Sequence, residues 1–154
     1  MILPEFPEWQ WDIYGKGDDY EELVTMTKQS GIDSQLHFCG QVGDLYERYN
    51  QYSFMVMTSR YEGFPMTLLE GMGNGLPLIS FDIPTGPNEI ITDGENGFLV
   101  KENDVETLVN RMKTLIEDGC LREAMSNCSK KRCELFSIDD VLESWGQAIN
   151  KLLE

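Results

Sequence analysis

Residues 59–72 have the sequence Ser59-Arg60-Tyr61-Glu62-Gly63-Phe64-Pro65-Met66-Thr67-Leu68-Leu69-Glu70-Gly71-Met72. The apolar run before this stretch, residues 53–58, is typical of a strand in a parallel sheet that is covered on both faces. Pro65 favours the start of a helix, because proline is well tolerated in a first turn. Gly73-Asn74-Gly75 then ends that helix. The segment therefore predicts a buried strand, a loop containing a glycine, and a helix over residues 65–72.

The first turn of this predicted helix offers backbone amides to an anion. The amides near Met66, Thr67 and Leu68 lack intrahelical acceptors, and the positive end of the helix dipole lies beside them. Together these features predict a phosphate site. The chain has a net charge of −15, from 27 acidic and 12 basic residues. In so acidic a chain, a local site of this kind is the expected way to hold a diphosphate.

Two glutamates lie on either side of this predicted phosphate site. Glu70 is in the second helical turn, too far along to cap the first amides, and its two carboxylate oxygens suit the vicinal hydroxyls of a ribose. Glu62 lies in the preceding loop, nearer to where a sugar would extend beyond the phosphates. A pair of carboxylates is also typical of a glycoside hydrolase. We disfavour that alternative, because the sequence gives no sign of an apolar pocket that would raise either pKa.

Strand and helix patterns alternate along the whole chain, which predicts a parallel sheet with helices on both faces. The 154 residues suit one domain, which we expect to span residues 1–154. Ligands of such sheets bind at the carboxyl ends of the strands, where residues 15–17, 40–42 and 59–67 are expected. The predicted strands are 9–14, 35–39, 53–58, 77–81 and 98–100. The predicted helices are 19–30, 44–49, 65–72, one that starts at Asn103 with a capping box to Glu106, 121–132, and a terminal helix at about 137–154.

Charge and hydropathy exclude several classes of protein. An acidic chain is poorly suited to binding nucleic acid, which requires Lys and Arg to neutralise phosphates. We expect the side chains of the basic run Lys130-Lys131-Arg132 to be solvated, with weak contact to an anionic membrane as an alternative. No segment approaches the roughly 20 apolar residues that span a bilayer, and the N-terminal residues do not resemble a secretory signal. We expect a cytoplasmic protein, with peripheral membrane contact as the weaker alternative.

Cysteine and histidine give no metal-binding pattern. Cys39, Cys120, Cys128 and Cys133 lack the two-residue spacing of zinc or redox sites, and His37 is the only histidine. We expect no metal site, reduced thiols, and a His37 that is packed or at the rim of the fold.

The pattern Glu62-Gly63-Phe64-Pro65-x-x-Leu68-x-Glu70-x-Met72-x-x-Gly75-x-Pro77 resembles the signature of a known family. This family is the group 1 retaining glycosyltransferases, which have two facing Rossmann-like domains and build bacterial surface polysaccharides. Its hallmark is the pair of glutamates with seven residues between them. Residues 11–17, 38–40, 80–91 and 93–100 agree as well, so the resemblance covers about the whole chain. It implies the C-terminal, nucleotide-sugar-binding domain, with a three-layer α/β/α Rossmann-like fold and a mostly parallel sheet.

The resemblance also implies a role for each matching residue. Glu62 would lie by the transferred sugar as the catalytic residue, and Glu70 would bind the donor ribose. The junction of loop and helix would hold the donor phosphates through Gly63, Phe64, Pro65, Met66, Thr67 and Leu68. Gly40, Gln41 and Val42 would edge the nucleobase, while Gly15 and Gly17 would let the first loop approach the donor. Lys16 is a candidate for a phosphate contact, with a solvated lysine an equal alternative. The family generally needs no metal or other cofactor here; the expected donor is a nucleotide-diphosphate sugar, with UDP-sugar as a guess.

In the family, one more strand-helix unit precedes the strand that matches residues 9–14, and it carries an arginine and a lysine that neutralise the leaving diphosphate. Only eight residues precede Trp9 here, too few for a crossover unit. We therefore expect this first unit to be missing and the chain alone to bind donor without efficient turnover. The strand at Trp9 would pair directly with the strand at residues 53–58, or another copy would fill the gap. Expected partners are the donor, a glycan or lipid-linked acceptor, and a missing N-terminal acceptor domain or another copy of the chain.

Two alternatives from other functional classes stay open at this point. A non-catalytic nucleotide-binding or assembly module is one, because Trp145 lies on an amphipathic terminal helix whose apolar face invites self-association. A sugar-nucleotide epimerase of the same architecture is the other. A dinucleotide-binding loop at Gly15-Lys16-Gly17 is disfavoured, because Tyr20 stands where that fingerprint needs a third glycine. The base, the sugar and the acceptor are not predicted by the sequence.

Overall fold

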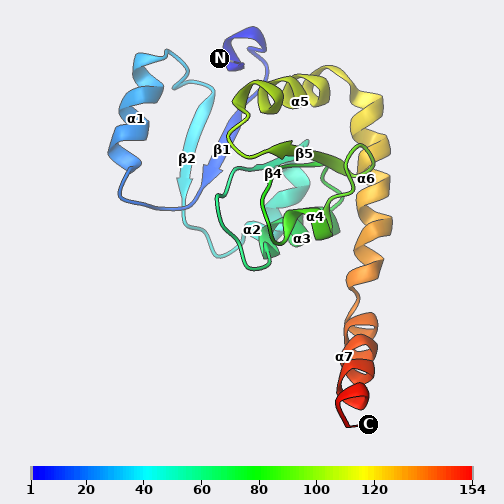
Figure 1. Ribbon diagram of the computed structural model, residues 1–154. Helices are drawn as coiled ribbons and strands as arrows, with labels where there is room; N and C mark the ends of the chain where they lie inside the picture. The colour runs from blue at the N-terminus through cyan, green and yellow to red at the C-terminus, as the bar shows by residue number, and fades with distance from the viewer. Residues whose placement is uncertain (1, 154) are drawn as a thin grey trace. The chain divides into compact units, whose positions relative to one another are not determined.

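Parallel strands alternate with helices in the computed structural model, which describes residues 2–153 (Figure 1). The strands form two ladders, β1-β2 and β3-β4-β5. The chain divides after Leu45 into two compact units. The expected α/β class with parallel pairing is confirmed, whereas the expectation that residues 1–154 form one domain stays a prediction.

The first unit is built on the strands β1 (Trp11–Tyr14) and β2 (Leu36–Gly40), joined by α1 (Tyr20–Gln29). The strands pair in parallel, with Trp11 opposite Leu36, and the register shifts after Ile13 so that Tyr14 lies opposite Gly40. Gly31, at φ +66°, follows α1 and ends it as predicted. A short 3-10 helix, η1 (Leu3–Glu5), precedes β1.

The second unit is built on a three-stranded sheet, β3 (Met55–Met57), β4 (Leu78–Asp82) and β5 (Gly97–Lys101). β4 lies between the other two and pairs with both in parallel. Its residues Leu78, Ile79 and Ser80 are completely buried, as expected for a central strand covered on both faces. The partner of β3 in this ladder is β4, and the direct pairing of residues 9–14 with 53–58 stays a prediction.

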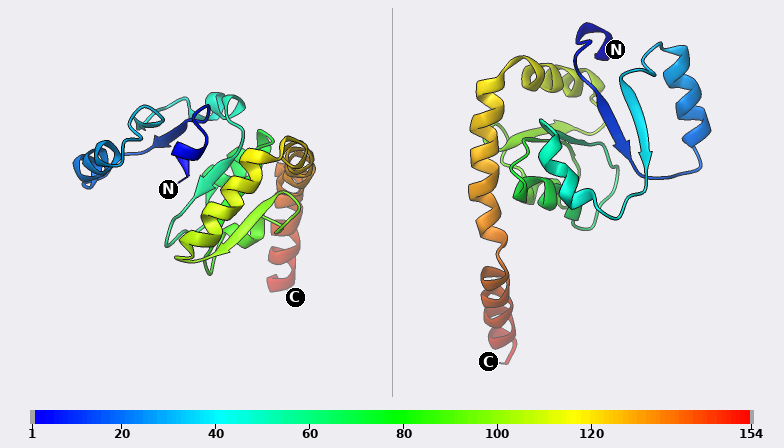
Figure 2. Two further views of the ribbon diagram at one scale, coloured as in Figure 1. Left: turned by 90° about the horizontal axis from the view of Figure 1, so that it is seen from above. Right: turned by 180° about the vertical axis from the view of Figure 1, so that it is seen from behind.

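Helices cover both faces of the β3-β4-β5 sheet (Figures 1 and 2). α3 (Met66–Gly73) and α4 (Pro87–Ile90) lie on one face, and α5 (Val105–Glu117) lies on the other. The short α2 (Leu45–Arg48) and η2 (Tyr49–Gln51) come before β3. α6 (Gly119–Cys133) packs against α3, and η3 (Glu134–Phe136) leads into α7 (Ile138–Leu153), which has no buried residue.

The predicted cap of α5 is wrong by one residue. Asn103 adopts the left-handed region at φ 64°, which asparagine tolerates in turns, and so it is part of the turn before the helix. Asp104 caps the helix instead: its carboxylate accepts hydrogen bonds from the Thr107 amide at 3.0 Å and the Thr107 hydroxyl at 2.8 Å. These bonds lower the pKa of Asp104 below its usual value.

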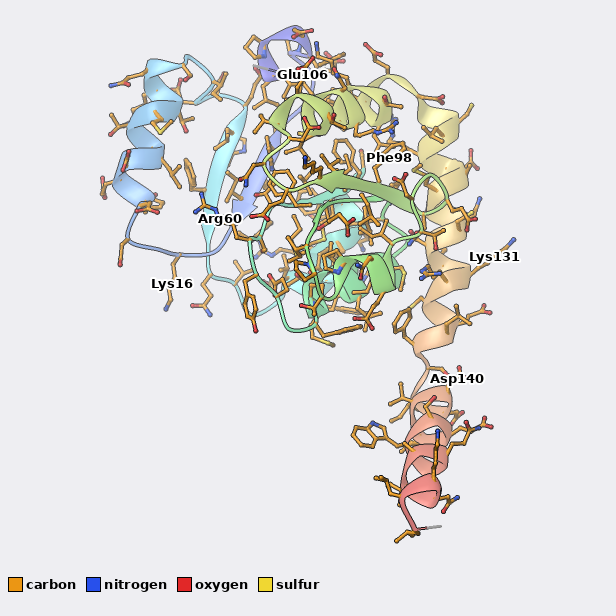
Figure 3. The ribbon with its side chains drawn as sticks, viewed as in Figure 1. Lys16, Arg60, Phe98, Glu106, Lys131 and Asp140 are labelled. Atoms are coloured by element: carbon orange, nitrogen blue, oxygen red, sulfur yellow. The ribbon has the colours of Figure 1, made fainter. Side chains whose placement is uncertain are left out.

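The basic run on α6 is not a uniformly solvated face. Arg132 donates from Nε to the Ile90 carbonyl at 2.6 Å and from Nη2 to the Glu89 carbonyl at 2.8 Å, which caps the C-terminal end of α4. Lys131 points away from the sheet (Figure 3). Among residues 2–153, none of the helices combines the length and the apolar composition needed to cross a membrane.

Candidate functional site

The β3–α3 segment is the part of the second unit that carries the predicted phosphate site. β3 ends at Met57 and α3 begins at Met66, so residues 58–65 form a loop at the carboxyl end of the strand. Leu68 and Met72 are completely buried and fix α3 on the sheet. Gly71 permits close packing, because a Cβ there would lie 2.9 Å from the Met55 sulfur.

The first turn of α3 presents two backbone amides rather than the three predicted. Within residues 2–153, no acceptor is found for the amides of Met66 and Thr67, consistent with their place in a first helical turn. The Leu68 amide instead donates to the Pro65 carbonyl at 3.0 Å, so its prediction as a free donor is wrong. The reason is local: Pro65 is the N-cap residue, not the first helical residue, and its carbonyl starts the turn.

The loop beside these amides is open to solvent. Gly63 and Phe64 are exposed, and a Cβ built on Gly63 would meet no atom within 4 Å. Pro65 is buried. Solvent therefore reaches the loop that precedes the amides of Met66 and Thr67.

Glu70 lies one turn further along α3 and is held by a tyrosine. The Tyr49 hydroxyl lies 3.2 Å from the carboxylate oxygen Oε2 of Glu70, to which it can donate. The same hydroxyl is 3.4 Å from the Thr67 carbonyl oxygen. Tyr49 is only 3% exposed, and its burial, followed by the nearby Glu70 carboxylate, raises the pKa of Tyr49 well above the usual value. The phenol therefore stays protonated and serves Glu70 as a donor.

Tyr49 belongs to the candidate site, and the sequence analysis did not predict it. It belongs to the short η2 helix, 21 residues before Glu70. Neither spacing nor hydropathy connects these two positions, because the contact depends on how η2 packs beside α3. A buried tyrosine usually has a hydrogen-bond partner for its hydroxyl, but the sequence does not identify that partner.

Glu62 lies in the β3–α3 loop and is half-buried. Its backbone carbonyl accepts a hydrogen bond of 2.6 Å from the Thr85 hydroxyl. Its neighbours Arg60 and Tyr61 are exposed, Tyr61 at 85%, and Arg60 is labelled in Figure 3. The structure thus places Glu62 and Glu70 in one segment, one before and one after the two amides.

The other predicted donor contacts lie in the first unit, at the carboxyl ends of β1 and β2. The Gly15 amide donates to the Gly40 carbonyl at 2.8 Å, so the two predicted loops meet there. Gly15 and Gly40 have positive φ, +137° and +66°, which explains why both are glycine. Gly17 and Gln41 are exposed, and Val42 is half-buried. Lys16 is exposed and extends from its loop (Figure 3).

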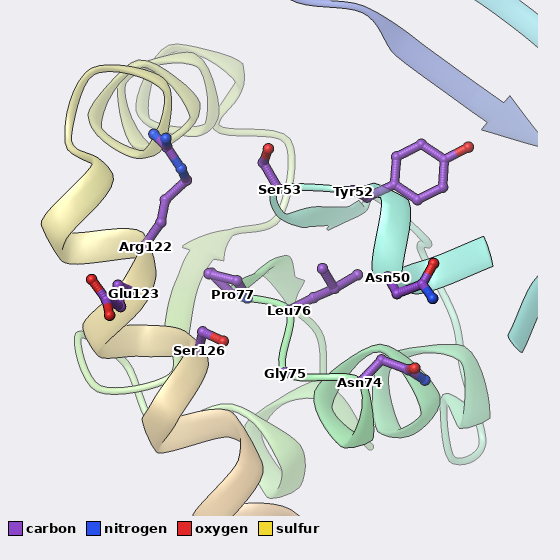
Figure 4. A pocket seen from close by; sticks show the side chains of 10 residues that line it. All are labelled: Asn50, Tyr52, Ser53, Asn74, Gly75, Leu76, Pro77, Arg122, Glu123 and Ser126. Carbon is purple, nitrogen blue, oxygen red and sulfur yellow. The ribbon is translucent and has the colours of Figure 1, made fainter. Parts of the chain in front are cut away.

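A cavity of about 310 Å³ lies elsewhere in the second unit (Figure 4). Ser53 and Pro77, which precede β3 and β4, line it, so it lies at the amino ends of these strands. It contains none of the predicted site residues. The cavity is therefore separate from the loop that follows β3.

The described histidine and cysteines do not form a metal site. Within residues 2–153, no three His, Cys, Asp or Glu side chains gather closely enough to hold a metal ion. The four cysteines are free of disulfides. His37 Nδ1 lies 3.0 Å from Asp12 Oδ1 across the β1-β2 ladder, in keeping with a histidine at the rim of the fold.

Most of the chain matches a known family. The family described as "Glycosyl transferases group 1" matches residues 2–132. The poly(glycerol-phosphate) alpha-glucosyltransferase of Bacillus subtilis (strain 168) is 25% identical over 154 residues, which are 100% of this chain and 23% of that protein. The UDP-N-acetylglucosamine–peptide N-acetylglucosaminyltransferase GtfA subunit of Streptococcus pneumoniae serotype 4 is 33% identical over 156 residues, covering 97% of this chain and 31% of that protein.

A solved structure agrees in fold. The crystal structure of the pneumococcal O-GlcNAc transferase GtfA in complex with UDP and GlcNAc superposes with a TM-score of 0.85 and 31% identity, covering 99% of this chain and 31% of that one. The chain thus spans about a quarter to a third of the proteins named here. This likeness confirms the predicted Rossmann-like α/β class.

Proposed function

This chain belongs to the glycosyl transferases group 1 family, and on that premise we propose that it is the donor-binding part of a retaining glycosyltransferase. The observation that carries the proposal is the β3–α3 segment. Two free amides, of Met66 and Thr67, follow an open loop, and Glu70 stands one turn later with its carboxylate held by Tyr49. A diphosphate fits the amides and a ribose fits the carboxylate.

Each predicted residue has a role in this proposal. Glu70 accepts hydrogen bonds from the ribose hydroxyls, and the segment from Gly63 to Thr67 faces the two phosphates. Glu62 lies by the transferred sugar and acts as the catalytic residue. In the first unit, Gly15, Lys16 and Gly17 approach the phosphates, and Gly40, Gln41 and Val42 edge the nucleobase.

The proposed donor is a UDP-sugar, and the proposed acceptor is a glycan or a lipid-linked acceptor. The complex of the pneumococcal relative with UDP and GlcNAc supports the choice of uridine. The proposal includes no metal: the amides and the dipole of α3 supply positive potential for binding the diphosphate. It also places the protein in the cytoplasm, with Lys131 on α6 available for weak contact with an anionic membrane surface.

We further propose that these 154 residues alone transfer sugar poorly. The transition state places negative charge on the departing diphosphate, and the amino end of one helix offers only about half a positive charge. Each hydrogen-bond donor that such a site lacks costs about 100- to 1,000-fold in rate. Efficient transfer then needs an acceptor domain, or another copy of the chain, that completes the site.

Calorimetry with UDP, GDP and ADP tests the proposed binding function. We expect UDP to bind with the strongest affinity of the three, and uridine to bind much more weakly because it lacks the phosphates. A chain that binds none of the three diphosphates contradicts the proposed function. A transfer assay on the same preparation tests the second proposal, and rapid sugar transfer would refute the claim that these 154 residues alone transfer sugar poorly.

The exposed face of α7 favours one alternative function, a non-catalytic assembly module. Ile138, Trp145 and Leu152 recur every seven residues and are exposed at 74%, 65% and 86%. An apolar stripe of this kind is typical of a surface that meets another protein. Light scattering distinguishes the alternatives, because an assembly module would self-associate with rising concentration even in the absence of nucleotide.

A further inference from the structure

The loop after β4, residues 83–86 (the β4–α4 loop), contacts the loop after β3, residues 58–65 (the β3–α3 loop). The Thr85 hydroxyl donates a hydrogen bond of 2.6 Å to the carbonyl oxygen of Glu62. β3 and β4 are adjacent and parallel, so their carboxyl ends meet at one edge of the sheet. Thr85 therefore fixes the backbone of the β3–α3 loop just before Gly63.

Gly86 makes a second contact with the same loop, at its other end. Gly86 has a φ of +98°, and a Cβ built on it would lie 2.3 Å from Cδ and 3.1 Å from Cγ of Pro65. The Pro65 ring is buried and cannot move aside without shifting the start of α3. Only glycine can therefore occupy this position without displacing Pro65.

These two contacts enclose the part of the loop that faces the proposed phosphates. One is at Glu62 and the other at Pro65, with Gly63 and Phe64 between them. The free amide of Met66 follows Pro65 directly. The direction of that amide is therefore set by the backbone that Thr85 and Gly86 hold.

The β4–α4 loop is itself firmly held, as a support must be. Ile83 and Pro87, at its two ends, are buried. Arg132 on α6 donates to the carbonyls of Glu89 and Ile90, which fixes α4 behind the loop. The loop therefore presents Thr85 from a rigid base, although the Thr85 side chain itself is exposed.

We propose that Thr85 and Gly86 are positioning residues for the donor diphosphate, acting through the backbone of the β3–α3 loop. The inference rests on the proposed function and adds to it two residues that lie outside the segment between the two glutamates. It predicts that weakening either contact lowers affinity for the phosphates and leaves affinity for the nucleoside unchanged.

The first test replaces Thr85 in the 154-residue chain and measures UDP and uridine affinities by calorimetry, with weak uridine binding read by competition. Thr85→Val removes the hydroxyl at an exposed position, so the protein should fold. We expect UDP affinity to fall about three- to tenfold, uridine affinity to be unchanged, and Thr85→Ser to restore UDP binding. Thr114→Val is the matched control, since the Thr114 hydroxyl bonds the Asn110 carbonyl at 2.9 Å within α5, away from the loop.

The second test separates the contact at Gly86 from the cost of its backbone angle. Gly86→Ala adds a methyl group against Pro65, whereas Gly94→Ala adds one at a similar φ of +79° with no atom within 4 Å. Both substitutions strain the backbone, so both should lower the melting temperature. Only Gly86→Ala should weaken UDP binding.

The outcomes distinguish this inference from the proposed function. If the unaltered chain binds no nucleoside diphosphate, the proposed function fails and this inference fails with it. If the chain binds UDP but Thr85→Val binds it equally well, only the inference is overturned. Equal loss of UDP and uridine binding in Thr85→Val would also overturn it, because the effect would then be general rather than directed at the phosphates.

Discussion

At the scale of single residues, we propose that nucleotide recognition depends on the carboxylate of Glu70. It lies one turn from the free amides of Met66 and Thr67, and the buried Tyr49 hydroxyl restricts its orientation. A carboxylate that is already oriented loses less entropy when it binds a ribose. Affinity should therefore depend both on Glu70 and on the tyrosine that holds it.

Replacement of Glu70 by alanine should lower UDP affinity about 10- to 100-fold, because hydrogen bonds to a charged group are lost. Calorimetry measures this loss, and the melting temperature should change little because Glu70 is only half-buried. Glu123→Ala, at an exposed position on α6, is the control. UDP binding by Glu70→Ala at the original affinity would exclude Glu70 from the site.

Tyr49→Phe removes only the hydroxyl that holds Glu70 and should lower UDP affinity about three- to tenfold. Tyr46→Phe is a matched control, because Tyr46 is 60% exposed and packs edge-on against the Tyr49 ring. The double variant Tyr49→Phe/Glu70→Ala should bind no more weakly than Glu70→Ala alone. Additive losses in the double variant would show that Tyr49 acts independently of Glu70.

These residues also show how far the sequence alone can predict a site. Glu62, Glu70 and the amides after Pro65 follow from local spacing, because they lie within one strand-loop-helix segment. Tyr49 and Thr85 do not, since they reach this segment from 21 and 23 residues away through tertiary packing. The Leu68 amide was predicted wrongly because the exact start of a helix depends on the backbone angles of one residue, Pro65.

At the scale of elements, the predicted bounds of the five strands, and of α1, α2, α3 and α6, lie within two residues of the observed ones. Apolar runs locate β3 and β4 well, because buried parallel strands have few polar positions. The four-residue α4 was not predicted, since so short a helix has no periodic pattern and is held by Gly86 and Arg132 instead. The cap of α5 was placed at Asn103 because both Asn103 and Asp104 suit an N-cap, and only the backbone conformation decides between them.

Asp104→Ala should therefore destabilise the protein, because it removes the cap of α5. Asn103→Ala should leave that cap in place. We expect Asp104→Ala to lower the melting temperature by roughly 2–4 °C at pH 7. The folded pKa of Asp104 is lowered, so its contribution is present above the unfolded value of about 3.9 and is lost as the pH falls through the folded value. The difference in melting temperature between the original chain and Asp104→Ala should therefore shrink as the pH falls through that acidic range. A gap that widens on acidification would contradict the cap.

At the scale of the whole molecule, the chain consists of two compact units, each with predicted donor-binding residues at the carboxyl ends of its strands. The alternation of strands and helices was enough to predict parallel pairing. It was not enough to predict two ladders, because strand order depends on which edges meet in the folded protein. The chain spans 31% of the length of its pneumococcal relative.

The most direct test of the central claim is a titration of the ¹⁵N-labelled chain with UDP, followed by amide chemical shifts. The account predicts that the largest shifts fall on Gly63, Phe64, Met66 and Thr67, and that the Thr67 shift disappears when uridine replaces UDP. Shifts concentrated on the cavity residues Ser53, Arg122 and Ser126, with residues 63–67 unaffected, would contradict it.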